Sequence, residues 1–203
     1  MTHNPRSIDE AVAWINAMEL PVDLPCFVAS LHRPLILNAT SSRVSLQPSG
    51  GARSPRIFLL DDPLIMSITL AGEARVLLEF GELVNTRDSI KAEIAFPVTA
   101  PLAPDAPYNR LMYNADRTSC SLCHAAEEEL PDTVGRGRVF VSRALRPVDT
   151  EWVELDAVRA EHASCDPVQE AERCALLEAM FEHGHVYQGA FPEEMRTIFN
   201  QRR

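Results

Sequence analysis

The chain has 203 residues, and its composition excludes several classes of protein. Hydrophobic residues make up 46% and charged residues 24%, which are ordinary globular proportions rather than those of a disordered chain or a membrane protein. The formal net charge is −10, whereas nucleic-acid binding depends on clustered lysine and arginine. We therefore expect a globular protein without a nucleic-acid partner. No membrane span is expected either, because the sequence lacks a run of about 18 apolar residues.

The first segment with a clear periodicity spans residues 8–20, where apolar residues recur at helical spacing. Ser7 followed by Glu10 is typical of a capping box, and Pro21 ends the segment. We expect a short amphipathic helix whose apolar stripe packs on the body of the protein.

Between residues 26 and 98, short runs of β-type residues alternate with turn residues. In the last run, apolar residues alternate with Lys91 and Glu93, which predicts one face in contact with water. Strands at this spacing predict an antiparallel β-sandwich or partial barrel, and with the N-terminal helix and a C-terminal helical segment they give an α+β fold class. The predicted strands are 35–39, 44–46, 56–60, 64–70, 75–80 and 89–98.

A proline-rich segment at residues 97–107 favours an extended path. We interpret it as the junction between an N-terminal helix plus β-rich module, residues 1–98, and a second segment, residues 99–203, although the two also make sense as one continuous domain. The second segment is expected to contain helices at 119–129, 153–164 and 170–183 and a strand at 138–145.

Five cysteines are many for a small cytosolic protein, and they favour a periplasmic or secreted location. The first residues lack the basic and apolar regions of an export signal, so we expect the signal to be missing from this sequence.

A disulfide between Cys165 and Cys174 is expected from their proximity. A straight helix starting at Pro167 would hold these residues about 12 Å apart, beyond the Cα reach of about 7 Å. Either the helix starts nearer Glu170 or Cys174 pairs elsewhere. With the bridge formed, Cys26 remains as a buried or externally paired thiol.

Cys120, Cys123 and His124 form a C-x-x-C-H motif, the spacing that attaches a c-type haem covalently. Each thiol can add to one vinyl group of the porphyrin, and the adjacent imidazole can reach the iron. Three other interpretations stay open. They are a thiol–disulfide switch, although the usual βαβ pattern is absent, a zinc site with a fourth ligand, and ordinary disulfides.

These residues resemble the haem-attachment segment of c-type cytochromes. The resemblance implies that Cys120 and Cys123 carry thioether bonds, that His124 is the proximal iron ligand, and that the cofactor is one covalent haem c. It covers little more than the motif and its flanking residues. The β-rich region before the motif departs from the all-helical class I cytochromes, so the family fold is not carried over.

The sixth iron ligand decides the chemistry, because methionine raises the iron potential relative to a second histidine. Met195 is our first candidate, since it lies in a proline-containing loop of the kind that presents methionine ligands. His183 and His185 are the alternatives, because they flank Gly184 just past the end of a predicted helix.

The sequence thus favours a mono-haem electron-transfer protein, either a carrier or the haem module of a larger extracytoplasmic assembly, with a redox protein as its partner. We expect an electron carrier rather than an enzyme. One alternative is a disulfide-stapled secreted structural or binding module without haem. Another is a haem sensor or peroxidase-like protein with an open iron site.

Overall fold

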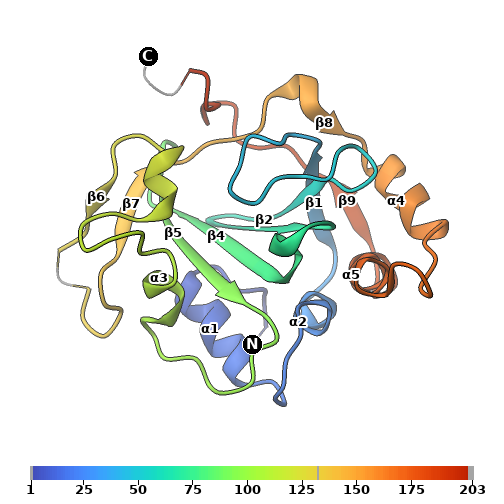
Figure 1. The fold of residues 1–203 in the computed structure, drawn as a ribbon, viewed down its shortest axis with the longest axis horizontal. Helices are drawn as coiled ribbons and strands as arrows, with labels where there is room; N and C mark the ends of the chain where they lie inside the picture. The colour runs from blue at the N-terminus through green and yellow to red at the C-terminus, as the bar shows by residue number, and fades with distance from the viewer. Residues whose placement is uncertain (1, 132, 201–203) are drawn as a thin grey trace.

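The computed structural model describes residues 2–131 and 133–200, and in this part the strands form one nine-stranded sheet (Figure 1). The strand order is β6-β7-β5-β4-β3-β2-β1-β8, with β9 also paired to β1. Every pair is antiparallel except β1 with β9. The sheet does not close on itself. The α+β class, with an antiparallel sheet, an N-terminal helix and a C-terminal helical segment, is confirmed.

The strands are β1 (Leu35–Thr40), β2 (Arg56–Asp61), β3 (Leu64–Thr69), β4 (Leu77–Leu83), β5 (Asp88–Ala95), β6 (Glu128–Glu129), β7 (Phe140–Arg143), β8 (Trp152–Val153) and β9 (Val186–Gln188). The α-helices are α1 (Ile8–Asn16), α2 (Leu24–Ser30), α3 (Ala106–Asn109), α4 (Leu155–Ala163) and α5 (Ala171–Phe181). Short 3-10 helices are η1 (Glu73–Val76), η2 (Ser119–Leu122) and η3 (Asp149–Glu151).

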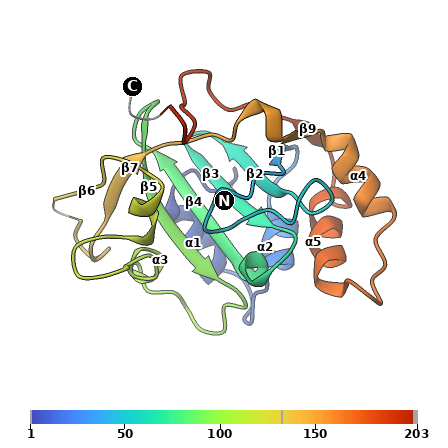
Figure 2. The ribbon, with the colours of Figure 1, turned by 45° about the horizontal axis from the view of Figure 1, so that its top comes forward.

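The strands carry different residues on their two faces because successive side chains of a strand point to opposite sides. One face, here called the apolar face, is covered by α1 and α2, which lie together on one side of the sheet (Figures 1 and 2). It is buried in the main core. The opposite, polar face lies beneath the segments that contain η2 and Met195. The apolar face includes Leu37, Leu59, Met66, Ile68, Leu78 and Ile94, and the polar face includes Arg56, Ser67, Glu79 and Lys91.

Helix α1 begins where the sequence predicts. The Ser7 hydroxyl accepts a hydrogen bond from the backbone N–H of Glu10 at 3.1 Å, and the Glu10 carboxylate accepts one from the N–H of Arg6 at 2.8 Å. These contacts satisfy N–H groups that have no partner inside the helix. Ile8 and Ile15 on its apolar stripe are fully buried, so the predicted packing against the body is confirmed.

Both sequence segments contribute to the same sheet. Strands β1 to β5 come from residues 1–98, whereas β7 pairs with β5 at one side and both β8 and β9 pair with β1 at the other. The proline-rich stretch that starts at residue 97 is therefore a connection inside one sheet-centred structure.

The predicted strand at 44–46 is wrong, because the structure has a loop there. Side-chain oxygens occupy the backbone donors of this loop: the Thr40 hydroxyl accepts from the N–H of Ser42 at 3.1 Å, and the Ser45 hydroxyl accepts from the N–H of Gln47 at 3.0 Å. Such local bonds compete with strand pairing.

The predicted helix at 119–129 is also wrong, since only the four-residue η2 forms. The Glu127 carboxylate accepts a hydrogen bond from the N–H of Thr118 at 3.0 Å and another from its hydroxyl. This contact folds the chain back on itself. Ala126 has a positive φ of 55°, which no helical residue adopts.

The disulfide between Cys165 and Cys174 is confirmed, with a Cα–Cα distance of 5.7 Å. Helix α5 starts at Ala171 rather than at Pro167. The residues between the cysteines therefore form a turn that brings the two thiols together.

In the described part of the chain, no helix is both long and apolar enough to span a membrane.

Candidate functional site

The C-x-x-C-H motif lies over the polar face of the sheet. Cys120 and His124 line a cavity of about 90 Å³ together with Lys91 and Met195. A neighbouring cavity of about 130 Å³ is lined by Cys120, Cys123 and His124 together with Phe199 near the end of the chain. The sheet thus forms the floor of a site whose other walls come from distant parts of the sequence.

His124 is held by one hydrogen bond whose direction fixes its tautomer. Its Nδ1 lies 2.7 Å from the backbone oxygen of Arg143, and a carbonyl can only accept, so Nδ1 carries the proton and donates it. Burial lowers the pKa of His124 to about 3, and the nearby positive charge of Lys91 acts in the same direction. The ring is therefore neutral at neutral pH, and its Nε2 keeps a free lone pair. A metal-bound histidine commonly donates its other ring N–H to a backbone carbonyl in this way.

The two cysteines of the motif are not joined to each other, nor is either in another disulfide. Burial raises the pKa of the Cys120 thiol to about 11, while Lys91 opposes the shift. The Thr118 hydroxyl accepts a hydrogen bond from the backbone N–H of Cys120 at 3.2 Å, which holds the first turn of η2. A thiol kept protonated in this way is a poor nucleophile compared with the low-pKa thiolates of redox enzymes.

Lys91 is the only lysine of the chain, and it lies on the floor of the site. Its Nζ donates to the hydroxyl of Ser89 and to the backbone oxygen of Arg143, the latter at 3.4 Å. Burial lowers its pKa to about 8, although Cys120 and the carboxylate of Glu79 favour the charged form. The prediction that this face of 89–98 meets water is wrong at Lys91, which is partly buried because the segment carrying Arg143 covers it.

Arg56 completes a charged group on the same face. Its guanidinium forms an ion pair with Glu79 and donates to the hydroxyl of Ser67 at 2.7 Å. Our sequence analysis did not select Arg56 or Lys91 as site residues. The alternation of charged with apolar residues along β5 was a usable signal, but it is equally typical of an exposed face.

Met195 is the one distal-ligand candidate that lies at the site. It is 2% exposed and lines the same cavity as His124. Before it reaches Met195, the chain passes close against β1 at Gly189. A Cβ atom at this position would clash with Ile36. The backbone oxygen of Met195 accepts from Arg146 Nε at 3.0 Å, which fixes the segment over the polar face.

His183 and His185 lie elsewhere. Both are exposed residues between α5 and β9, and neither lines the cavities beside His124. The ring of His185 stacks on Tyr187 with their centroids 6.3 Å apart. Cys26 is exposed and outside any disulfide, so of the two expected states, a buried or an externally paired thiol, the buried one is wrong.

The donor set fits a haem c, whereas the space around it is small. The residue types are those that a haem c uses: two cysteines outside any disulfide, a histidine with an unprotonated Nε2 and a buried methionine, distributed over two neighbouring cavities. The cavities of about 130 and 90 Å³ are smaller than the roughly 300–1,000 Å³ of ordinary ligand pockets. Binding of a macrocycle therefore requires the covering segments, which carry Leu145 and Phe199, to move outward.

A pre-assembled zinc site receives less support. Among the residues that the structure describes, no group of three His, Cys, Asp or Glu side chains is arranged to hold a metal ion. Cys120, Cys123 and His124 are thus near one another in sequence without converging on a common point.

Comparisons with known proteins found no matching family model, no matching curated protein and no matching solved structure.

Proposed function

We propose that this chain carries one covalently attached haem c and acts in electron transfer. The observation that carries the proposal is that His124 and Met195 line one cavity, with Cys120 in its wall, although 70 residues separate Met195 from the motif in the sequence. The haem iron, when bound, supplies one-electron redox chemistry.

The roles of the residues follow from their chemistry. Cys120 and Cys123 would hold the porphyrin through thioether bonds, and His124 would bind the iron through Nε2. The hydrogen bond from His124 Nδ1 to Arg143 keeps this nitrogen unprotonated. Met195 would be the second protein ligand to the iron, and a methionine sulfur would favour a higher potential than a second histidine.

The burial of Met195 favours an electron carrier, or the haem module of a larger extracytoplasmic assembly, over a sensor or peroxidase-like protein with an open iron site. A redox protein would be its partner. A periplasmic or secreted location is in keeping with the Cys165–Cys174 disulfide.

The decisive test is production of the protein in a host competent for cytochrome c maturation. We expect a Soret absorption band and haem that resists extraction with acidified acetone. Cys120→Ser and Cys123→Ser should each lose most of the covalent haem. Cys26→Ser is the matched control, because Cys26 is an exposed, unbridged thiol away from the site, and it should retain the haem. Wild-type protein without covalent haem would contradict the proposal.

The role of Met195 has its own test. Met195→Leu should abolish the sulfur-to-iron charge-transfer band of the oxidised protein and lower its potential, because a sulfur ligand is lost. Met180→Leu is the control, since Met180 is a fully buried methionine of α5. An unchanged spectrum in Met195→Leu would exclude Met195 as the ligand while leaving haem attachment intact.

A further inference from the structure

A separate cavity of about 420 Å³ lies beside β1, between η3 and the segment that follows β9. Its volume falls in the roughly 300–1,000 Å³ range of small-molecule sites. None of the four residues assigned to the haem lines it. Arg146, Pro147 and Val148 line both this cavity and the cavity of about 130 Å³ beside His124, so the two are neighbours.

Asn38 of β1 brings an unpaired hydrogen-bond acceptor to this cavity. The residue is 6% exposed. Its Nδ2 donates to the backbone oxygen of Gly189 at 3.0 Å, and since a carbonyl only accepts, this bond fixes which end of the amide is the oxygen. Oδ1 accepts no hydrogen bond from the residues that the structure describes, yet it is not one of their fully enclosed unpaired atoms. It therefore keeps access to the cavity that Asn38 lines.

The indole of Trp152 lies on the same side of the sheet as the Asn38 amide. Asn38 and Thr40 point to the same face of β1 because they are two residues apart. Trp152 of β8 lies directly opposite Thr40 in the antiparallel pair, and opposite residues share a face. Trp152 lines the cavity and is 41% exposed. Tryptophan is the aromatic side chain that attracts cations most strongly, so this ring is a suitable surface for a positively charged ligand.

The charged groups that line the cavity are not balanced. Arg146 forms an ion pair with Asp149, and its Nε donates to the backbone oxygen of Met195 at 3.0 Å. Its charge and this donor are therefore already used within the protein. Glu193 also lines the cavity. It is exposed and forms no ion pair in the described part of the chain, so one negative charge is uncompensated.

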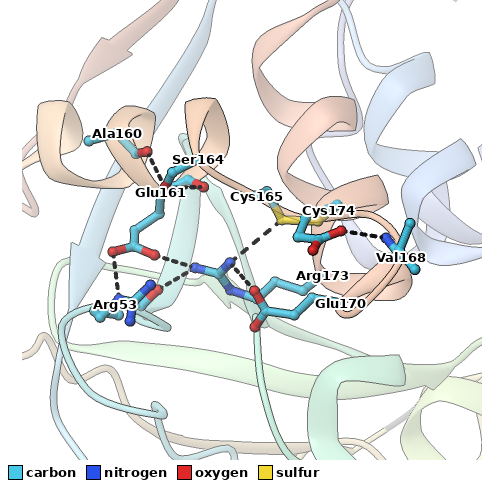
Figure 3. Close-up of polar contacts among 10 residues, drawn as sticks. Arg53, Ala160, Glu161, Ser164, Cys165, Val168, Glu170, Arg173 and Cys174 are labelled. Atoms are coloured by element: carbon cyan, nitrogen blue, oxygen red, sulfur yellow. Dashed lines mark hydrogen bonds and ion pairs between the residues drawn. A yellow bond between two sulfur atoms is a disulfide. The ribbon is translucent and has the colours of Figure 1, made fainter.

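The cluster of charged side chains around Arg173, by contrast, is balanced (Figure 3). Arg173 pairs with Glu161 at 2.8 Å and with Glu170 at 3.2 Å, and Arg53 pairs with Glu161 at 3.0 Å. Two guanidinium groups thus meet two carboxylates. In the cavity beside β1, one guanidinium meets two carboxylates, and a ligand of positive charge would restore the balance.

We propose that the cavity between η3 and the segment after β9 binds a small primary ammonium carried on an apolar stem. The ammonium would lie near Glu193 and the ring of Trp152, and one of its N–H groups would donate to Asn38 Oδ1. The stem would be buried against Val148 and Phe191, which also line the cavity. The net charge of −10 would attract such a cation and repel an anion. This binding site is separate from the proposed haem site.

Three probes that share a phenylethyl stem test the proposal. 2-Phenylethylammonium has both the charge and N–H donors, 2-phenylethanol keeps a donor without the charge, and N,N,N-trimethyl-2-phenylethylammonium keeps the charge without a donor. In titrations of the full chain followed by nuclear magnetic resonance, 2-phenylethylammonium should bind and shift the indole N–H signal of Trp152. Each of the other two should bind about tenfold more weakly, the ratio expected for one lost interaction of this kind.

A matched pair of variants locates the site. Glu193 and Glu194 are exposed neighbours of equal charge, but of the two only Glu193 lines the cavity. Glu193→Gln should weaken the binding of 2-phenylethylammonium about tenfold, whereas Glu194→Gln should bind it as the wild type does. Trp152→Ala should also weaken it. Asn38→Ala removes the acceptor, so the two cations should then bind equally. If Asn38→Ala does not fold, the comparison of Glu193→Gln with Glu194→Gln still decides.

The proposal is overturned if 2-phenylethylammonium does not bind the wild type, or if 2-phenylethanol binds as tightly. It is also overturned if Glu193→Gln and Glu194→Gln weaken binding equally. Equal affinity of the wild type for both cations would exclude the hydrogen bond to Asn38. Since no residue assigned to the haem lines this cavity, a negative result here leaves the proposed function intact, and a chain without haem can still be tested for amine binding.

Discussion

The apolar and polar faces of the sheet are buried by different means, and the difference separates what stabilises the fold from what serves the site. On the apolar face, Ile68 and its neighbours pack beneath regular helices, and area removed from water supplies the stability. On the polar face, Lys91, Arg56 and Glu79 lie beneath irregular segments and need specific partners. Burying such groups contributes little net stability, so the polar face contributes less to folding than the apolar face does.

The largest loss of stability is expected from a substitution on the apolar face. Ile68→Ala should lower the free energy of unfolding by about 2–5 kcal/mol, because it removes methyl groups from a full core, and Ile68 is fully buried. Ser67→Ala on the polar face should cost about 1 kcal/mol through the lost hydrogen bond from Arg56. Urea unfolding measures both. Equal losses would contradict the distinction between the faces.

The next largest effect is a loss of stability in acid, which we expect from His124 in protein made without haem. Its folded pKa of about 3 lies below its unfolded value of 6.5, so the unfolded state binds more protons between these pH values. The free energy of unfolding should therefore fall as the pH is lowered below 6.5. At pH 5 the loss, relative to the value above pH 6.5, should be about 2 kcal/mol. His124→Gln should flatten this dependence in urea unfolding at a series of pH values. A variant that is as acid-sensitive as the wild type would show that His124 is not shielded from water.

A smaller rise of the free energy of unfolding with pH is expected from Lys91 in alkaline solution. Its folded pKa of about 8 is below the unfolded 10.5, so its contribution to stability rises with pH across this window, by about 1 kcal/mol from pH 8 to 9. Cys120 opposes this trend because its pKa is raised, and Glu79, Asp88 and Arg56 also face the amine. The difference between wild type and Lys91→Met isolates the lysine. A difference that stays constant with pH would contradict the shifted pKa.

The smallest effect is expected in the loop that covers the polar face. Glu127→Ala removes two hydrogen bonds to Thr118 and should cost about 1 kcal/mol or less at this partly exposed position. The amide of Thr118 should then exchange faster with deuterium. Glu128→Ala is the control, since its side chain is exposed, and it should leave the exchange rate unchanged. Equal rates in both variants would show that Glu127 does not hold the motif.

Regular elements were predictable where local chemistry and burial agree. The capping residues Ser7 and Glu10 and the β-type runs of β1 to β5 predict their elements within a few residues. The predictions fail where side chains satisfy the backbone locally, as Ser45 does in the loop after β1 and Glu127 does after η2. Those contacts depend on which rotamer the rest of the structure permits, and periodicity does not contain that information.

The sequence by itself determined the α+β class and the C-x-x-C-H motif at Cys120, Cys123 and His124, and it favoured the pairing of Cys165 with Cys174, which the start of α5 at Ala171 then decided. The class and the motif follow from spacing and periodicity along the chain. Only the tertiary structure decided that Met195, rather than His183 or His185, lines a cavity with His124, and that Lys91 is covered. The physical reason is that both facts depend on which distant segments cross the polar face, and long-range packing rather than local preference fixes those crossings.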